Sequence, residues 1–514
     1  MLRAITLLAA LSLFGPAASA GPAAAWLGAD GKPNASARDA LNLLAEAPAD
    51  GLVAEDYRAR ELALQATALQ HAAQADATQA QVFERSLDAA LQRFGHDLHR
   101  GRVDPRSLGF RIEARGNEPV DFAAALYAAA ARQQLPQAVA ALRPGLAQYG
   151  LLRQALARYR MLASDTSLQA LPAIAPARSL EPGGTYVGAS QLQRRLVALG
   201  DQPAEAAPPG DQYGPALVDA VKRFQARHGL DADGIVGAAT LAALNVPLDK
   251  RVRQLELALE RLRWLPDLGR ERFIGINIPM FRLFAWDPAA PADALVEMNV
   301  VVGRALNTQT PVLFDQMRYL VFRPYWNVPL SIARNEVLPG LARDPAYLQR
   351  HDMEIVRGGG DNAQPALAAS AENLALLRQG VLRVRQRPGP RNSLGPVKFI
   401  FPNDDNVYLH GTPAMQLFGR ARRDFSHGCV RVQEPLALAQ WVLKDQPQWT
   451  RQRVEAAMAG AAPLRVDLAK PLPVILFYVT AMVMPSDQAL HFATDIYGHD
   501  ARLERALAQR RAGP

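Results

Sequence analysis

A single cysteine stands among residue types that suit nucleophilic chemistry. Residues 426–432 read Ser-His-Gly-Cys-Val-Arg-Val, and Cys429 is the only cysteine in 514 residues. His410 lies 19 positions upstream, in the segment Tyr-Leu-His-Gly-Thr-Pro at 408–413. A thiol attacks as its thiolate, so it needs a neighbouring group that takes its proton. The two segments therefore predict Cys429 as a nucleophile and His410 as its base.

The residues beside this pair suggest how it is held. Gly428 permits a tight turn that presents the N–H groups of Gly428 and Cys429 to a developing oxyanion. No Asp or Glu lies within three residues of His410, so the carbonyl of Gly411 is the candidate that orients the imidazole.

Two further side chains of the motif have predicted roles. His427 is too near the cysteine in sequence to be the obvious base, and we expect it to stabilise the turn or polarise the oxyanion. Arg431 follows two residues after the cysteine and has the planar fork that grips a carboxylate.

Two other interpretations of the cysteine stay open at this stage. Free cysteines often serve as small buried hydrophobic residues. Alternatively, His410, His427 and Cys429 bind zinc, although the sequence has no CxxC or HExxH pattern to support a metal site. We predict neither a metal nor an organic cofactor.

The N-terminus has the pattern of an export signal. Arg3 precedes an apolar run from Ala4 to Phe14, and Ala18-Ser19-Ala20 fits a small-residue cleavage site. The run is short for a membrane span, but an uncleaved anchor remains an alternative. The chain has 57 Lys and Arg against 49 Asp and Glu, a net charge of +8, and loss of Arg3 leaves +7. Such mild basicity suits an anionic surface or plain solubility, and no basic tract indicates nucleic acid.

The N-terminal half has helical periodicity interrupted by segments rich in Pro and Gly. The expected order is a signal peptide at 1–20, a linker at 21–36, a helical domain at 37–170, a linker at 171–184, a three-helix module at 185–246 and a connecting helix at 247–270.

From residue 271 the apolar period changes to two, as in Ile274, Ile276 and Ile278. We expect a mostly-β, sandwich-like or barrel-like domain over 271–445 and a C-terminal region over 446–514 that packs on either neighbour. Residues 331–391 interrupt the strands with helices, as a lid or as a subdomain without a role in catalysis. Within them, Arg383, Arg385 and Arg387 either steer an anionic substrate or form the solvated face of a strand. The predicted fold class is α+β with several domains.

The two catalytic segments together resemble the signature of the L,D-transpeptidases, cysteine enzymes that cross-link peptidoglycan stem peptides. Residues 271–445 are similar to that family's catalytic domain, including Arg323–Pro329, which contains Trp326, and Ser393–Phe399. Separately, Val221–Leu230 with Asp233–Gly237 resembles a peptidoglycan-binding module.

The resemblance implies a reaction and a set of site residues. Cys429, His410, Gly411, His427 and Gly428 would be catalytic, while Arg431, Ser426, Tyr408 and Trp326 would contact the substrate. Cys429 would attack a tetrapeptide stem and expel D-alanine, and a second stem's amine would resolve the thioester to give a 3→3 cross-link. Acylation by carbapenems is expected as well.

The implied partners are peptidoglycan stem peptides and glycan, with other wall synthases as further candidates, and the implied location is the periplasm. A carboxypeptidase or cysteine hydrolase on the same site, and a catalytically silent wall-binding scaffold, are the alternatives.

Overall fold

The structure is a computed structural model in which residues 26–72, 76–113, 120–174, 179–205, 208–268, 270–290, 295–306, 308–359 and 363–512 are described. The chain divides into two compact units, Met1–Leu268 with Tyr478–Pro514 as unit 1, and Gly269–Phe477 as unit 2. The predicted signal peptide at 1–20, and residues 21–25 of the predicted linker, lie outside the described residues.

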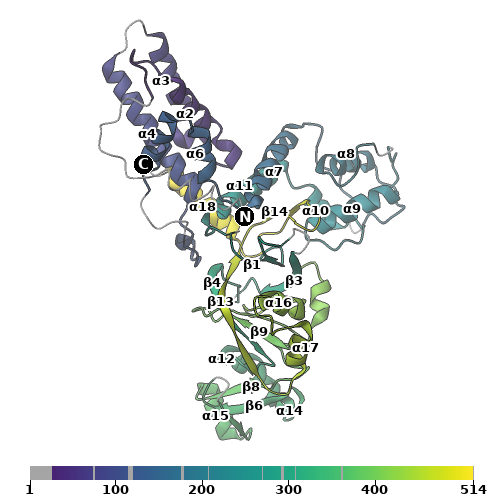
Figure 1. The fold of residues 1–514 in the computed structure, drawn as a ribbon. Coiled ribbons are helices and arrows are strands. Elements are labelled where there is room, and N and C mark those ends of the chain that lie inside the picture. The colour runs from purple at the N-terminus through teal and green to yellow at the C-terminus, as the bar shows by residue number, and fades with distance from the viewer. Residues whose placement is uncertain are drawn as a thin grey trace. The chain divides into compact units, whose positions relative to one another are not determined.

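Unit 1 begins with a helical part, drawn in purple and blue in Figure 1. Its helices are α2 (Ala35–Ala45), α3 (Ala59–His71), α4 (Ala77–Arg100), α5 (Phe122–Ala131), α6 (Leu135–Leu142) and α7 (Ala147–Ser164), with 3-10 turns η2 (Ala47–Asp50), η3 (Ala54–Tyr57) and η4 (Pro105–Leu108). Phe83, Leu87, Leu91 and Phe94 form a buried stripe on α4, because their spacing keeps them on one helix face.

The linker expected at 21–36 is wrong for its described part. Trp26 is 0% exposed in the helical core, and its Nε1 donates to Asp88 at 2.8 Å. Asn34 caps α2 by accepting from the N–H of Ala37. A large aromatic side chain that buries its ring and pairs its N–H anchors the chain there, despite a composition rich in Ala, Gly and Pro.

A second helical part of unit 1 contains α8 (Ala189–Leu199), α9 (Pro215–Arg227) and α10 (Ala238–Leu244). Their apolar faces meet at Leu192, Leu196, Val221 and Phe224, all buried. The segment expected as a linker at 171–184 is partly integrated here, since Leu180 pairs with Val236 and Gly183 donates to Tyr213.

Helix α11 (Leu248–Trp264) is a core element of unit 1, in contact with α4, α7, α18 and β14. It buries charged residues as well as leucines. The carboxylate of Glu260 accepts from Arg102 Nε at 3.1 Å and from Arg263 Nη1 at 2.9 Å, and all three side chains are buried. Each buried charge therefore has a partner of opposite sign.

The end of the chain is shared between the units. Residues up to Phe477 belong to unit 2, and Tyr478 onward to unit 1, where the hairpin β14 (Ala481–Val483) and β15 (Leu490–Phe492) precedes α18 (His499–Ala512). The region expected as one C-terminal piece over 446–514 is thus divided at residue 477.

Unit 2 is built on one nine-stranded sheet with the order β11-β3-β12-β10-β9-β4-β13-β1-β2. Strand β3 also pairs with β2, so the strand order returns on itself and the sheet closes. The strands are β1 (Phe273–Asn277), β2 (Arg282–Trp286), β3 (Val296–Gly303), β4 (Leu313–Phe322), β9 (Val397–Ile400), β10 (Leu409–His410), β11 (Asp424–Ser426), β12 (Val430–Val432) and β13 (Leu464–Phe477). Three further elements belong to this unit: η7 (Met415–Gly419), α16 (Pro435–Val442) and α17 (Arg451–Ala459).

The insertion is a small subdomain with its own core. A four-stranded sheet in the order β5-β8-β6-β7 packs with helices, and Ile355, Leu377 and Val384 are among its buried residues. Its elements are β5 (Trp326–Asn327), α12 (Leu330–Ile332), the π-helical turn η6 (Ala333–Val337), α13 (Leu338–Arg343), α14 (Tyr347–Arg350), β6 (Met353–Arg357), β7 (Gln364–Leu367), α15 (Ala371–Gln379) and β8 (Leu382–Gln386). It begins slightly before residue 331, because β5 pairs with β8.

The predicted fold class is confirmed: helical parts and a β-rich domain with an inserted subdomain make an α+β protein of several domains. Within the described ranges, none of the helices has the length and apolar character needed to cross a bilayer.

Candidate active site

Strand β10 is the centre of the site, because it brings separate motifs into register. It pairs with β12 in parallel, Leu409 with Val430 and His410 with Arg431. On its other side it pairs antiparallel with β9, His410 with Lys398. Directly paired residues share a face of the sheet, so the imidazole lies between two cationic side chains.

Cys429 immediately precedes β12 and so lies beside the start of β10. The Val430 N–H donates to Tyr408 O at 3.1 Å, which fixes the turn before the strand. The thiol is half-buried, and its Sγ donates to Asn406 O at 3.7 Å. The side chain of Tyr408 also hydrogen-bonds Cys429. The nucleophile candidate thus has polar partners and remains partly open to solvent.

His410 has a defined tautomer. It is 5% exposed, and its Nδ1 lies 2.5 Å from Gly411 O. A carbonyl can only accept, so Nδ1 carries the proton and Nε2 is the free acceptor. This hydrogen bond is the contact that the role expected of Gly411 requires, and the role itself stays a prediction.

The backbone at Gly395 packs closely against Gly411, the residue whose carbonyl accepts from His410. A Cβ on Gly395, whose φ is +63°, would lie 2.6 Å from the carbonyl carbon of Gly411. A Cβ on Gly411 would meet Pro396 Cδ at 2.9 Å. Larger residues at either position would move the carbonyl that orients His410.

His410 is neutral at ordinary pH. Burial lowers the pKa of His410 to about 3, and the positive charges of Arg431 and Lys398 add to this effect. The hydrogen bond to Gly411 acts in the opposite direction and raises the pKa. A neutral imidazole with a free Nε2 can accept a proton.

The thiol is also neutral in the resting state. Burial raises the pKa of Cys429, although hydrogen bonds from Tyr408 and the charges of Lys398 and Arg431 oppose the shift. Burial and the neighbouring Cys429 raise the pKa of Tyr408 well above its usual value, so its hydroxyl stays a donor. The arrangement can therefore supply a thiol, a neutral base and a phenolic donor in one place.

The loop before Cys429 corrects two expectations. Gly428 has a φ of +115°, which favours glycine, but its N–H donates to Ser426 Oγ at 3.2 Å and does not point to an oxyanion. Ser426 is 2% exposed and its hydroxyl donates to Cys429 O at 2.6 Å, so it shapes the loop in place of the expected substrate contact. The N–H of Cys429 has no hydrogen-bond partner within the described part of the chain.

Thr310 holds this loop from β3's side and was not foreseen from the sequence. Its buried Oγ1 accepts from Gly303 N at 2.8 Å and donates to Gly428 O at 2.7 Å. Asn406, whose carbonyl meets the thiol, was also missed. Its φ of +54° was the only local signal, and that is not readable from sequence.

His427 faces the insertion. Its Nε2 lies 2.9 Å from Glu336 Oε1, on the π-helical turn η6, and both side chains are partly exposed. Single-turn π segments are frequent at functional sites. The expected oxyanion role has no support in this geometry.

Arg431 has capacity left for a ligand. Its Nε is buried without a hydrogen-bond partner among the described residues, and burial and the charge of Arg304 lower the pKa of the guanidinium. An unsatisfied buried donor is costly unless a substrate group completes it.

Trp326 and the arginine cluster belong to the insertion. Trp326 packs against the insertion core and pairs with Gln386 in β5–β8, and its contact with a substrate stays a prediction. Arg385 is 4% exposed, pairs with Glu354 and lies over the ring of Tyr325 at 4.1 Å, so it is not part of a solvated strand face, whereas Arg383 and Arg387 are exposed. Arg387 also binds Glu354, so these two charges are compensated.

Within the described residues, no group of three or more His, Cys, Asp or Glu side chains is arranged so that it could hold a metal ion.

The fold and site define a class of protein: a multidomain α+β protein whose β domain holds a neutral histidine on β10 and one cysteine immediately before the neighbouring strand β12. Comparisons with known families agree. Residues 271–455 match the L,D-transpeptidase catalytic domain, 18–156 match a Scaffold domain, and 187–244 match the family described as "Putative peptidoglycan binding domain". Residues 271–455 of the chain are therefore similar to the catalytic domain of the L,D-transpeptidases.

Individual relatives are similar over parts of the chain. A protein of Haemophilus influenzae named "Putative L,D-transpeptidase" is 32% identical over 254 residues, 49% of this chain and 49% of the relative. The N-acetylmuramoyl-L-alanine amidase CwlL of Bacillus licheniformis is 45% identical over 64 residues, 12% of this chain and 18% of the relative. The chain thus spans about half of the first relative's length and less of the second's.

An L,D-transpeptidase from Mycobacterium smegmatis is 11% identical with a TM-score of 0.19, covering 40% of this chain and 58% of that chain. This likeness is too slight to support an argument.

Proposed function

We propose that this protein is a peptidoglycan L,D-transpeptidase that forms 3→3 cross-links through a thioester on Cys429. The observation that carries the proposal is the β10–β12 register: His410 lies on β10, Cys429 immediately precedes the paired strand β12, and the bond from Nδ1 to Gly411 O leaves Nε2 as the acceptor. The match of 271–455 to the family's catalytic domain supports the reaction class.

In the first half-reaction, Sγ of Cys429 attacks the carbonyl carbon at the L-centre of the diaminoacyl residue of a tetrapeptide stem. The thiol proton moves to Nε2 of His410 and then to the departing amine, so a thioester forms, the peptide bond breaks and D-alanine leaves. The free N–H of Cys429 is the remaining loop donor for the oxyanion.

In the second half-reaction, the side-chain amine of another stem attacks the thioester. His410 Nε2 takes a proton from the amine, the new amide forms, and the sulfur leaves to regenerate the thiol. Because His410 has a pKa of about 3, it returns readily to its neutral form after each transfer.

Arg431 is the proposed carboxylate partner of the donor stem. Its buried, unsatisfied Nε and planar guanidinium suit a substrate carboxylate, and its position opposite His410 puts that carboxylate beside the reacting bond.

The insertion is the proposed lid. Its support is the contact between Glu336 on η6 and His427, two residues before the cysteine. Such a cover would exclude water from the thioester until an amine arrives.

The wall-facing setting is part of the same proposal. The match of 187–244 to a peptidoglycan-binding family supports peptidoglycan as the partner, and export to the periplasm follows from the N-terminal sequence pattern. Reaction of Cys429 with carbapenems, a role in cell shape and association with other wall synthases are further expectations.

The test is product analysis with purified disaccharide-tetrapeptide. Cross-linked dimer with free D-alanine supports transpeptidation, and tripeptide with D-alanine but no dimer means hydrolysis. If wild-type protein gives no product, the remaining candidate function is a catalytically silent wall-binding scaffold. The Cys429→Ala variant is the matched control.

A further inference from the structure

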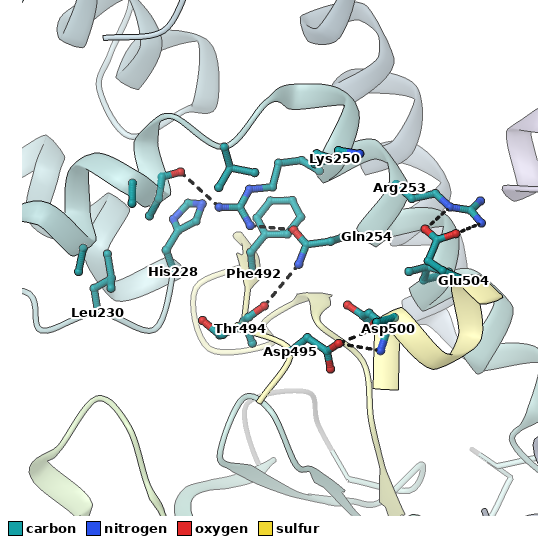
Figure 2. A pocket seen from close by; sticks show the side chains of 18 residues that line it. His228, Leu230, Lys250, Arg253, Gln254, Phe492, Thr494, Asp495, Asp500 and Glu504 are labelled. Atoms are coloured by element: carbon teal, nitrogen blue, oxygen red, sulfur yellow. Dashed lines mark hydrogen bonds and ion pairs between the residues drawn. The ribbon is translucent and has the colours of Figure 1, made fainter. Parts of the chain in front are cut away.

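Unit 1 contains a cavity of about 580 Å³ that belongs to no site described so far. Its walls come from α10, from α11 and from the C-terminal segment 492–504, as Figure 2 shows for the labelled Lys250, Gln254 and Phe492. The peptidoglycan-binding match ends at residue 244, so α11 and the C-terminal segment add walls outside that module. The volume is within the range of small-ligand sites.

Arg251 is a cation in this cavity without an anionic partner. Its Nη1 donates to Gln254 Oε1 at 2.7 Å and its Nη2 to Ala243 O at 3.3 Å, and the guanidinium lies 4.6 Å from the ring centre of Phe492. Within the described residues, no carboxylate forms an ion pair with it. Burial and the charge of Arg227 lower the pKa of Arg251 to about 10.

Several other charged groups of the cavity have partners. Arg253 pairs with Glu504 at 2.6 Å and with Glu256 at 2.8 Å. Asp500 pairs with Arg261. Asp495 accepts from Tyr478 Oη at 2.6 Å and from the N–H of His499 at 2.8 Å. Buried charges are normally paired, so a lone guanidinium marks a place for an anion.

A second cation stands at the rim. Lys250 is exposed, and among the described residues it forms no ion pair, although its charge contributes to lowering the pKa of Glu504. Together, Lys250 and Arg251 give this side of the cavity a net positive field.

The remaining walls are flat or small. His228 stacks on Phe224 at 3.8 Å and on Phe492 at 5.6 Å between ring centres. Burial, with the charges of Arg251 and Arg227, lowers the pKa of His228 well below its usual value, so the ring is neutral. Ala239, Ala242 and Ala243 also line the cavity, and their short side chains leave room for methyl-sized groups.

We propose that this cavity binds a free carboxylate of a peptidoglycan stem peptide, with Arg251 as its ion-pair partner and Lys250 at the entrance. Alanine methyl groups of the stem would lie against the alanine wall. The choice of a stem peptide, as opposed to another carboxylate, rests on the proposed function. The site is separate from Cys429, so its role would be to hold wall material and not to react with it.

Photoaffinity labelling of the full-length chain tests the site. The protein carries Cys429→Ala so that the probe is not turned over, and the probe is a soluble disaccharide-tetrapeptide with a photoreactive group. We expect labelled peptides from 239–257 and 492–504, and about tenfold weaker labelling with Arg251→Gln, since a charge-assisted hydrogen bond is lost. Lys222→Gln removes a charge from exposed Lys222 on α9, outside the cavity lining, and should change labelling less than twofold.

A second measurement needs no variant, in case Arg251→Gln folds poorly. A probe with its free carboxylates amidated should label the cavity about tenfold more weakly than the acid. Equal labelling by acid and amide, or labelling confined to peptides containing residues 408–431, would overturn the site.

The wild-type acylation assay, run in parallel, separates this inference from the proposed function. Labelling of the cavity without acylation of Cys429 would contradict the transpeptidase proposal and support the binding site. Acylation of Cys429 without labelling of the cavity would support the transpeptidase proposal and contradict the binding site.

Discussion

Buried charge is handled differently in the core of unit 1 and in the candidate active site. On α11, Glu260 is held between Arg102 and Arg263, and although burial opposes it, those two guanidiniums keep the pKa of Glu260 below its usual value. Around His410 the charges that shift its pKa, those of Arg431 and Lys398, are both positive. In the first arrangement opposite charges are paired, whereas in the second the buried Nε of Arg431 has no hydrogen-bond partner among the described residues.

The difference separates structural from functional charge in one molecule. A compensated buried ion pair holds the fold, and removing one partner leaves the other uncompensated. An uncompensated cation beside a neutral base fits a site where an oxyanion and a substrate carboxylate form or bind. Arg251 in the unit 1 cavity follows the second pattern.

The largest expected effect is on stability. Glu260→Gln would leave Arg102 and Arg263 buried without a carboxylate and should cost about 3–5 kcal/mol of the free energy of unfolding. Urea denaturation followed by tryptophan fluorescence measures it, with Glu61→Gln, an exposed carboxylate, as control. A midpoint equal to that of wild type would mean that the buried pairs do not stabilise the fold.

His410→Ala should slow acylation of Cys429 by about a hundredfold or more, because a general base is lost. The rate of thioester formation by mass spectrometry gives the effect, and His351→Ala in the insertion is the matched control. Near-normal acylation at neutral pH would remove His410 from the role of base.

The pH dependence distinguishes a neutral pair from an ion pair. Because the pKa of Cys429 is raised and that of His410 is about 3, the thiolate fraction should grow about tenfold per pH unit from pH 5 to 8. Iodoacetamide alkylation of Cys429 should follow that line without an inflection near pH 6.5. A plateau beginning near pH 6.5 would indicate an imidazolium–thiolate pair instead.

Arg431→Lys should lower kcat/KM for the donor by about tenfold, mostly through KM, because lysine lacks the planar fork. Arg422→Lys, at an exposed arginine bonded to Asp424, is the control. Unchanged kinetics would make Arg431 a structural residue.

The smallest effect is expected at the insertion. Glu336→Gln removes the charge that faces His427 and should shift the ratio of hydrolysis to transfer by about threefold toward hydrolysis, as a weaker cover admits water. Product ratios by chromatography measure it, with Glu372→Gln on α15 as control. A ratio equal to that of wild type would show that the contact between Glu336 and His427 has no part in closing a lid over the site.

The sequence was informative where chemistry is local. The Ser426–Arg431 motif and the segment around His410 were predicted to act together, and in the structure His410 on β10 pairs with Arg431 on β12. Long-range contacts were out of reach: Thr310 touches the Gly428 carbonyl over 118 positions, and Glu336 meets His427 over 91. Composition misled at Trp26, where one buried ring outweighs a linker-like neighbourhood. The family resemblance implied a substrate contact for Ser426, but its hydroxyl donates to Cys429 O within the loop.

The most direct test of the account is the mass of the intact protein after exposure to a tetrapeptide donor, with and without an amine acceptor. We predict an adduct on Cys429 equal to the donor less D-alanine, which disappears when the amine is added as a cross-linked product appears. An unmodified protein under both conditions, or an adduct on a residue other than Cys429, would contradict it.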